Sequence, residues 1–263
     1  MEREDAQGKE RILLDTGEGD KKNYLQNLKN VLAEEKASLG QILISHWHPD
    51  HIGGAREVLR EFGLSDKECK VSKYPEKTEA DKERGIYGID LDFLQDGQHI
   101  TTEDASLRTI YTPGHTVDHV VFQLEEENAL FSGDCILGET PAVFEDYVEY
   151  MKSLERILQL QPSRIYPGHG PVVENAVKRI QTYIEHRQIR EQQYLEAIKS
   201  KHDHGITSME IVEVVYPGLD EALKTAAENN VLVQLGKLLA EGRVLCSEER
   251  WFLVNASLDS SRL

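Results

Sequence analysis

Three histidines and one aspartate crowd the segment ILISHWHPDHIGG, directly after a run of apolar residues. In an extended chain, residues two positions apart point the same way, so His46 and His48 can bind one metal ion together. Asp50 and His51 then turn toward a second ion. Placing these polar side chains together is unfavourable, because they occupy space that apolar residues could fill and because protonated imidazoles repel one another. Bound metal ions would remove this cost. The segment therefore predicts ligands for a pair of metal ions at the end of a buried strand.

Three later segments supply isolated candidates, each just after a predicted strand and beside a glycine: His115 in TPGHT, Asp134 in LFSGD and His169 in YPGHG. A single histidine after a strand is usually an ordinary surface or core residue, so each of these alone is weak evidence. Together with the first cluster they provide the imidazoles and carboxylates that a dinuclear zinc centre needs, with open positions for water and substrate.

The segments that must position these ligands alternate between strand and helix patterns. Later strands follow one another as antiparallel pairs. A mixed sheet layered with helices, an α/β fold, is the economical arrangement. The predicted strands are residues 11–17, 41–45, 69–74, 107–115, 120–134 and 164–170, and the predicted helices are residues 24–35, 54–63 and 145–162.

The chain changes character after the PGHG motif. One long polar helix is predicted over residues 172–200, followed by two further helical patterns and a terminal strand pair, which suggests a small domain of winged-helix type. We therefore expect a metal-binding domain at residues 1–171, a connecting helix at residues 172–203 and a winged-helix-like domain at residues 204–263.

Composition bounds the possible functions. The chain has 263 residues, 39% of them hydrophobic, and a formal net charge of −17, which fits a soluble protein and disfavours non-specific attraction to nucleic acid or an anionic membrane. Bound divalent cations and a local basic patch can still make the electrostatic potential positive at one site. No apolar run approaches the roughly 18 residues of a membrane span, and the start is neither a signal nor a transit peptide. Three widely spaced cysteines favour a reducing compartment over a disulfide framework.

The successive motifs SHWHPDHIGG, TPGHT, FSGD and YPGHG resemble those of the metallo-beta-lactamase superfamily, over about residues 11–171. The resemblance implies an αββα sandwich with the metal site at one edge of the sheets. It is weakly specific for substrate, because the superfamily uses the same site on thioesters, lactams, persulfides and phosphodiesters.

A closer resemblance covers essentially the whole chain. The segments YTPGHTVDHVVFQLEEENALFSGDCILGE, VFEDYVEYMKSLERI, IYPGHGPV and YIEHRQIREQQ are similar to the animal beta-lactamase-like protein 2 group, described as mitochondrial endoribonucleases that act on single-stranded RNA. This resemblance implies one zinc ion on His46, His48 and His115, a second on Asp50, His51 and His169, and Asp134 bridging both.

Members of this group begin with further residues that form the first strands beside the site, whereas this chain starts almost at RILLDTG. We therefore expect an uncovered strand edge in the first sheet. The resemblance implies the mitochondrial matrix, while the N-terminus as written, if complete, would leave the protein in the cytoplasm.

These observations favour a zinc-dependent endoribonuclease for single-stranded RNA, with no DNA or membrane partner. Asp50 and Asp134 would act in catalysis through the zinc pair, which lowers the pKa of water toward 7 and stabilises charge on the attacked phosphate. Two alternatives stay open. A glyoxalase II-like thioesterase would use the same ligands, but the C-terminal region shows no clear cluster of basic residues for glutathione. A short form without its first strands could bind metal and be inactive.

Five further residues carry weaker expectations. Lys178 and Arg187, on the long helix, could contact phosphates, although such a charged helix is more often a solvated face. His119 and His186 could protonate the leaving group, but a supporting or surface role is expected for each. Cys135 should point away from the metal and pack in the core.

Overall fold

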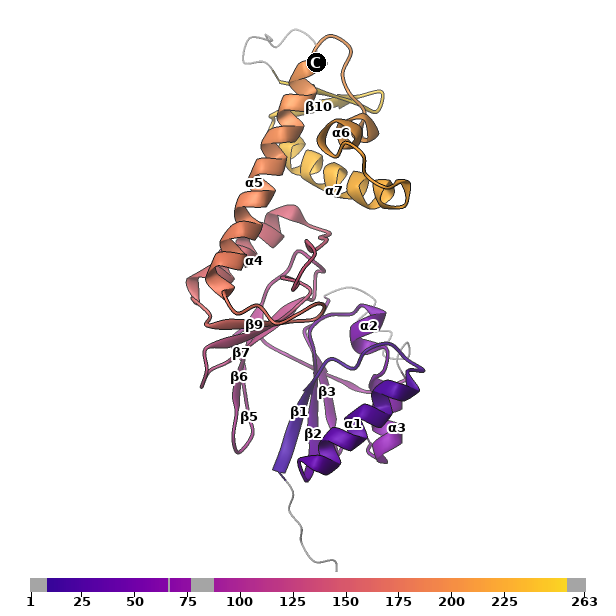
Figure 1. Ribbon diagram of the computed structural model, residues 1–263, viewed down its shortest axis with the longest axis vertical. Coiled ribbons are helices and arrows are strands. Elements are labelled where there is room, and N and C mark those ends of the chain that lie inside the picture. The colour runs from indigo at the N-terminus through magenta and orange to yellow at the C-terminus, as the bar shows by residue number, and fades with distance from the viewer. Residues whose placement is uncertain (1–8, 66, 77–87, 255–263) are drawn as a thin grey trace, which may run out of the picture.

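The computed structural model describes residues 9–65, 67–76 and 88–254, which form an αββα sandwich and a smaller C-terminal domain (Figure 1). The first sheet is parallel and has the strand order β1-β2-β3-β4. Its helices pack on the outer face. The elements of this half are β1 (Lys9–Leu14), α1 (Lys22–Glu34), β2 (Ala37–Ile44), α2 (Pro49–Ile52), α3 (Ala55–Phe62), β3 (Lys70–Lys73) and β4 (Leu91–Phe93).

The second sheet has the order β5-β6-β7-β8-β9, antiparallel except for the parallel pair β8 and β9. The helix α4 and the first half of α5 cover its outer face. Its elements are β5 (His99–Thr101), β6 (Ser106–Tyr111), β7 (Val120–Leu124), β8 (Ala129–Gly133), α4 (Tyr147–Gln159), β9 (Arg164–Pro167) and α5 (Ala176–Ser200). The expected mixed α/β sandwich is confirmed.

Alternation of side chains along the strands builds these layers. In β2, Ile42 and Ile44 pack in the cluster beneath α1 and α3, while Leu43 packs between the sheets. In β7, Val121 belongs to the cluster with α4 and Phe122 to the one between the sheets. Both strands are therefore buried on two faces, which explains their nearly continuous apolar runs.

The C-terminal domain contains α6 (Ser208–Val215), α7 (Glu221–Ala240), β10 (Val244–Ser247) and β11 (Arg250–Leu253). The helix α5 joins it to the sandwich, because Ile180 and Tyr183 lie in the core of the second sheet while Tyr194 and Ile198 lie in the core of this domain. No helix in the described part of the chain is both long and apolar enough to span a membrane.

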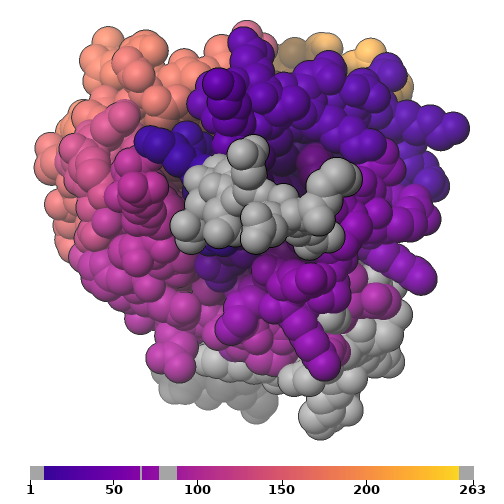
Figure 2. Space-filling model, turned by 90° about the horizontal axis from the view of Figure 1, so that it is seen from below, coloured from indigo at the N-terminus to yellow at the C-terminus, as the bar shows by residue number. Residues whose placement is uncertain are grey.

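The strand β1 lies at the edge of the first sheet. It pairs with β2, and no other strand among the described residues pairs with its free side. A cavity of about 300 Å³ lies along it, with apolar walls from Ile12, Leu14, Leu107 and Phe131. Figure 2 shows this underside of the molecule, with violet residues of the first sheet on one side and magenta residues of the second on the other. Within the described residues, β1 is thus the edge strand of the first sheet.

Candidate metal centre

The HxHxDH segment turns directly from the end of β2 into the single turn of α2. His48 is the N-cap residue of this turn and Pro49 its first residue, a position where proline fits because its missing N–H would have no partner. The glycines that follow are required by close packing, since a Cβ on Gly54 would lie 2.3 Å from the carbonyl oxygen of Thr16. Backbone packing therefore fixes the ligand segment against the turn after β1.

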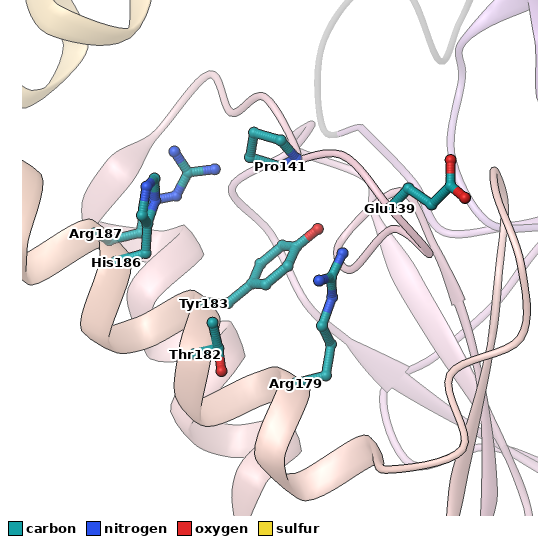
Figure 3. Close-up of a pocket in the computed structure, with 7 residues that line it drawn as sticks. All are labelled: Glu139, Pro141, Arg179, Thr182, Tyr183, His186 and Arg187. Atoms are coloured by element: carbon teal, nitrogen blue, oxygen red, sulfur yellow. The ribbon is translucent and has the colours of Figure 1, made fainter. Parts of the chain in front are cut away.

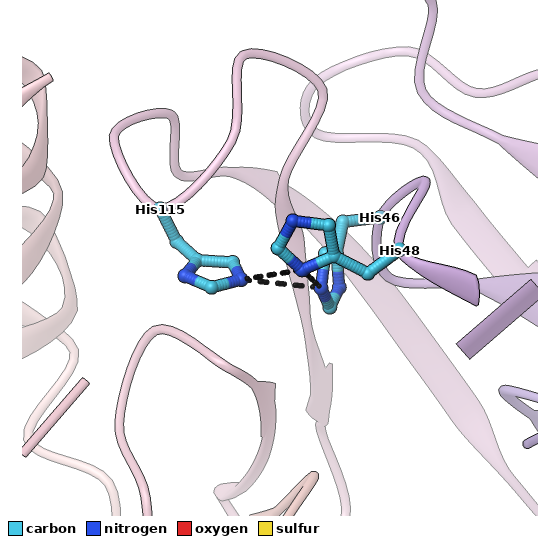
Figure 4. Close-up of side chains that lie close together, drawn as sticks. All are labelled: His46, His48 and His115. Atoms are coloured by element: carbon cyan, nitrogen blue, oxygen red, sulfur yellow. Dashed lines mark hydrogen bonds between the residues drawn. The ribbon is translucent and has the colours of Figure 1, made fainter. Parts of the chain in front are cut away.

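The three histidines predicted for the first ion converge on one point (Figure 4). Nε2 of His46 lies 2.9 Å from Nδ1 of His48, and Nε2 of His115 lies 3.2 Å and 3.1 Å from these two atoms. Three nitrogens bound to one tetrahedral zinc ion at about 2.0–2.1 Å would lie about 3.3–3.4 Å apart. The three rings therefore fit a single metal ion.

The second group consists of Asp50, His51 and His169. Nε2 of His169 lies 3.1 Å from Oδ2 of Asp50, and Nε2 of His51 lies 3.8 Å from the same oxygen. Asp134 lies between the groups, with Oδ1 3.4 Å from His51 and Oδ2 3.5 Å from His169 and 3.9 Å from His115. The structure thus brings all seven predicted ligands together and places Asp134 where both groups can share it.

Two buried atoms of this centre, Nε2 of His51 and Oδ1 of Asp134, form no hydrogen bond and face each other at 3.4 Å. Leaving buried polar atoms unpaired costs about 1–3 kcal/mol each. A bound cation would satisfy both atoms, and a set of imidazoles and carboxylates suits zinc and related divalent metals. The residues present therefore fit a pair of metal ions.

The protonation states of the ligands differ between the groups. Burial, reinforced by neighbouring imidazoles, lowers the pKa of each histidine in the first group, so these rings are neutral near pH 7 and can bind metal. Burial also disfavours the charged form of His51, but the carboxylates of Asp134 and Asp15 outweigh it and raise its pKa to about 10. Metal binding at His51 must therefore displace a proton.

Asp15 is a supporting residue that the sequence analysis missed. Its Oδ2 lies 2.8 Å from Nδ1 of His51, and its Oδ1 accepts a hydrogen bond from the Ser45 N–H at 2.7 Å. The parallel register of β1 and β2 pairs Leu14 with Leu43, which brings the residues after both strands together. The available signal is the carboxylate of LLDTG, directly after a predicted strand.

His119 lies behind Asp134 and is fully buried. Its Nε2 accepts a hydrogen bond from the Asp134 backbone N–H at 3.2 Å, and its Nδ1 lies 2.9 Å from Oγ1 of Thr112. His119 therefore supports Asp134 from behind, and its buried ring is not placed to protonate a leaving group. Cys135 is also fully buried, and burial raises the pKa of its thiol to about 12, so it is a core residue.

The two predicted phosphate contacts on α5 lie in different environments. Lys178 is exposed near the start of the helix, whereas Arg187 is buried and donates to the carbonyl of Ala142. His186, next to Arg187, is exposed. Neither Lys178 nor Arg187 belongs to the ligand groups, and their contact with RNA stays a prediction.

A cavity of about 430 Å³ opens beside the second group, between the turn after β1 and the end of β9. Its walls include Asp15, Tyr24, Asp50 and His51. The Asp50 and His169 side chains are 40% and 49% exposed, so the second group is open to solvent and substrate.

Comparisons with known proteins agree with this architecture. Residues 5–169 match the metallo-beta-lactamase superfamily, and residues 207–251 match the beta-lactamase associated winged helix domain. The chain is 46% identical over 242 residues to the beta-lactamase-like protein 2 homolog of Drosophila melanogaster, covering 92% of this chain and 82% of the relative. It is 37% identical over 194 residues to the atrochrysone carboxyl ACP thioesterase of Aspergillus fumigatus, covering 73% of this chain and 58% of that protein.

A solved structure shows the same fold. A metallo-beta-lactamase family protein from Thermus thermophilus superposes with a TM-score of 0.69 at 23% identity, over 92% of this chain and 89% of that one. The family match spans most of the chain, and the sandwich carries the ligands at the expected edge of its sheets. The chain therefore belongs to the metallo-beta-lactamase superfamily, whose members are typically metal-dependent hydrolases.

Proposed function

We propose that this chain is a zinc-dependent endoribonuclease that hydrolyses phosphodiester bonds of single-stranded RNA. The observation that carries the proposal is the Asp134 carboxylate between two ligand groups, one of them open to solvent. Paired metal ions about 3.5–4 Å apart are a common arrangement in nucleases and phosphatases, where they supply an activated water and stabilise charge on the attacked phosphate. Seven ligands would hold two zinc ions: His46, His48, Asp50, His51, His115, Asp134 and His169.

The protein's own residues orient this site. Nδ1 of His115 donates to the carbonyl of Val143 at 2.8 Å, which leaves the lone pair of Nε2 free to bind metal. Asp15 holds Nδ1 of His51 in the same way. His119 holds the backbone of Asp134. These three ligands are thus held in place by neighbouring residues, so little order must be gained at their positions when metal binds.

A single strand suits this site better than a duplex. A site at a sheet edge reaches a phosphodiester best where the strand is flexible and its bases are unstacked. In-line attack would leave a 5′-phosphate on one product, and the exposed second group leaves space for the strand to approach. The similarity to a beta-lactamase-like protein 2 homolog, at 46% identity over 92% of this chain, supports RNA as the substrate, because the motif resemblance links that group with single-stranded RNA.

A thioester hydrolase is the second candidate. The similarity to a protein named as an ACP thioesterase supports it, and the same seven ligands would serve that reaction. This similarity covers less of the chain and at lower identity than the similarity to the beta-lactamase-like protein 2 homolog. We therefore rank RNA first.

One experiment separates the candidates. Purified zinc-loaded protein is incubated with labelled single-stranded RNA, with S-lactoylglutathione and with an acyl-pantetheine thioester, each with and without chelator. We expect chelator-sensitive cleavage of the RNA and none by the Asp134→Ala variant. Thioester hydrolysis without RNA cleavage would replace the proposal by the second candidate, and no reaction on any substrate would identify a metal-binding but inactive protein.

The resemblance also leads us to propose that the protein acts in the mitochondrial matrix. Imaging of a tagged version expressed from its complete transcript checks this location. A cytosolic signal would contradict it.

A further inference from the structure

A small cavity lies between α5 and the loop that joins β8 to α4. Its volume is about 180 Å³, enough for a tetrahedral anion. The residues at its rim are exposed, while Tyr183 and Arg187 are buried. Its lining residues are Glu139, Pro141, Arg179, Thr182, Tyr183, His186 and Arg187 (Figure 3).

Arg187 is a buried cation without a carboxylate partner. Arg187 is only 5% exposed, and it forms no ion pair with an Asp or Glu among the residues that the structure describes. It donates to the Ala142 carbonyl, and its guanidinium lies 4.8 Å from the ring centre of Phe144. Its Nε has no partner. Burying an unpaired charge is costly, and this chain of net charge −17 has many acids that could have paired with it.

Arg179 adds a second guanidinium to the same cavity. It donates to the carbonyls of Leu137 and Gly138 at 3.0 Å and 3.1 Å, and its Nε is also buried without a partner. Within the described ranges it too has no ion pair. Figure 3 shows both guanidinium groups reaching from α5 toward the loop, with the Tyr183 ring between them and the Glu139 carboxylate turned away. The cavity is therefore rich in donors and poor in acids.

The loop beside this cavity also contacts both ligand groups. The backbone N–H of Gly138 donates to the carbonyl of His169 at 2.9 Å, and the carbonyl of Val143 accepts from His115. An anion bound between α5 and this loop would thus be anchored to the same backbone that holds the metal ligands.

We propose that this cavity binds a phosphate group of the single-stranded RNA, on the same strand as the bond that is cleaved. The proposal rests on the endoribonuclease function for the identity of the ligand, and on the two unpaired arginines for its charge. The bound phosphate provides the negatively charged partner that no carboxylate of the described fold provides for Arg187. It also orients the strand across the metal centre, which contributes to substrate affinity rather than to the chemical step.

A pair of charge-matched variants tests the proposal. Thr182 lines the cavity, whereas the neighbouring Gln181 is exposed and does not. Thr182→Glu places a carboxylate beside the two arginines and should exclude phosphate, while Gln181→Glu adds the same charge outside the cavity. Isothermal titration of the zinc-loaded proteins with inorganic phosphate should show one binding event fewer in Thr182→Glu only.

The kinetic expectation follows from the same pair. In Thr182→Glu the KM for single-stranded RNA should rise about tenfold or more, the effect of losing a hydrogen bond to a charged group. Its kcat with bis(p-nitrophenyl) phosphate, which is too small to fill both positions, should equal that of the parent. Gln181→Glu should match the parent in both assays.

The outcomes distinguish this proposal from the proposed function. If the parent cleaves no RNA but Thr182→Glu alone loses a phosphate-binding event, the RNA assignment fails and the anion site stands. If both variants bind phosphate like the parent, the anion site is wrong even in an active ribonuclease. A loss of activity on the small substrate as large as that on RNA would also overturn it, because the change would then act through the metal centre.

Discussion

At the scale of single residues, Asp134 is the side chain on which the paired site depends. Its two oxygens lie 3.4 Å from His51 and 3.5 Å from His169, so its removal affects both ligand groups. We expect Asp134→Ala to lose at least one of two zinc ions per chain and all hydrolysis. Elemental analysis of folded, untagged protein measures the zinc content. A variant of Asp134 that retained both ions would contradict the shared position.

Asp15→Asn changes only the hydrogen bond that supports His51. This variant should weaken zinc binding about 10–100-fold without abolishing it.

The titration of the histidines predicts that metal-free protein is sensitive to acid. The folded pKa values of His46, His48 and His115 are lowered, whereas in the unfolded chain they return to about 6.5. Below that pH the unfolded state binds more protons, so the free energy of unfolding falls as pH decreases. His51 has the opposite shift, and its contribution is fully present below pH 6.5 and is lost only as pH rises toward 10.

Thermal unfolding of chelator-treated protein between pH 7 and pH 5 checks this sign. The Tm should fall with decreasing pH, and less steeply in His48→Gln, which removes one of the titrating groups. A Tm that stayed constant or rose over this range would show that the imidazoles are not held neutral in the fold.

All seven candidate ligands could be named from the sequence, because each lies shortly after a predicted strand and the first four fall within six positions, and the structure brings their side chains together. The residues behind them could not be predicted in the same way. Asp15 meets His51 across 36 positions, and only the register of β1 on β2 brings them together. His119 was considered as an acid, but burial and its bond to the Asp134 backbone give it a supporting role.

At the scale of elements, one face of α5 fixes the loop after β8. The Tyr183 hydroxyl donates to the carbonyl of Thr140 at 2.6 Å and accepts from the N–H of Leu137 at 3.0 Å. Because this loop also contacts His169 and His115, Tyr183→Phe should speed zinc release and lower the free energy of unfolding by about 1 kcal/mol. Transfer of zinc to a chelating dye measures the release rate.

Tyr194→Phe provides a matched control on the same helix. Its hydroxyl bonds that of Tyr216 at 2.8 Å within the C-terminal domain, so the variant should lose similar stability and release zinc at the parent rate. Equal release rates in the two variants would show that the loop does not transmit the support of α5 to the metal ligands.

The long helices followed from the sequence pattern, whereas the strand pattern over residues 120–134 is the hairpin of β7 and β8, and the shortest elements were not predicted. The helix predicted at residues 145–162 is α4, but β4 and β5 have three residues each and α2 has four, too few to show a period. The long helix begins later than predicted. Val173 forms an isolated bridge with Ile165, and the side chain of Asn175 caps the helix by accepting from the N–H of Lys178.

At the scale of the whole molecule, α5 connects two hydrophobic cores, that of the second sheet and that of the C-terminal domain. Its residues pack first under the second sheet and then among α6, α7 and the terminal hairpin (Figure 1). Lys237 of α7 also pairs with Glu191 of α5 at 2.6 Å. The winged-helix class could be predicted from the order of its elements, but its placement depends on pairs such as this one, which no local pattern reveals.

The charge of the whole molecule predicts how RNA binding responds to salt. A net charge of −17 repels the strand at long range, so attraction must come from the metal pair and a few cations such as Lys178 and the arginines of the anion site. For single strands the logarithm of the binding constant falls by about 0.7 per neutralised phosphate for each decade of salt. Two to four contacts therefore predict a slope between about −1.4 and −2.8.

Fluorescence anisotropy with a hydrolysis-resistant phosphorothioate strand, between about 50 and about 200 mM salt, gives this slope. If the exposed Lys178 lies along the path of the strand, Lys178→Glu should weaken binding and make the slope shallower by about 0.7, with zinc content unchanged. Lys29→Glu serves as the control, because Lys29 lies on α1 and is paired with Glu61. A parent slope steeper than about −5 would require a broad cationic surface, and would contradict a site at which a few cations act against an acidic body.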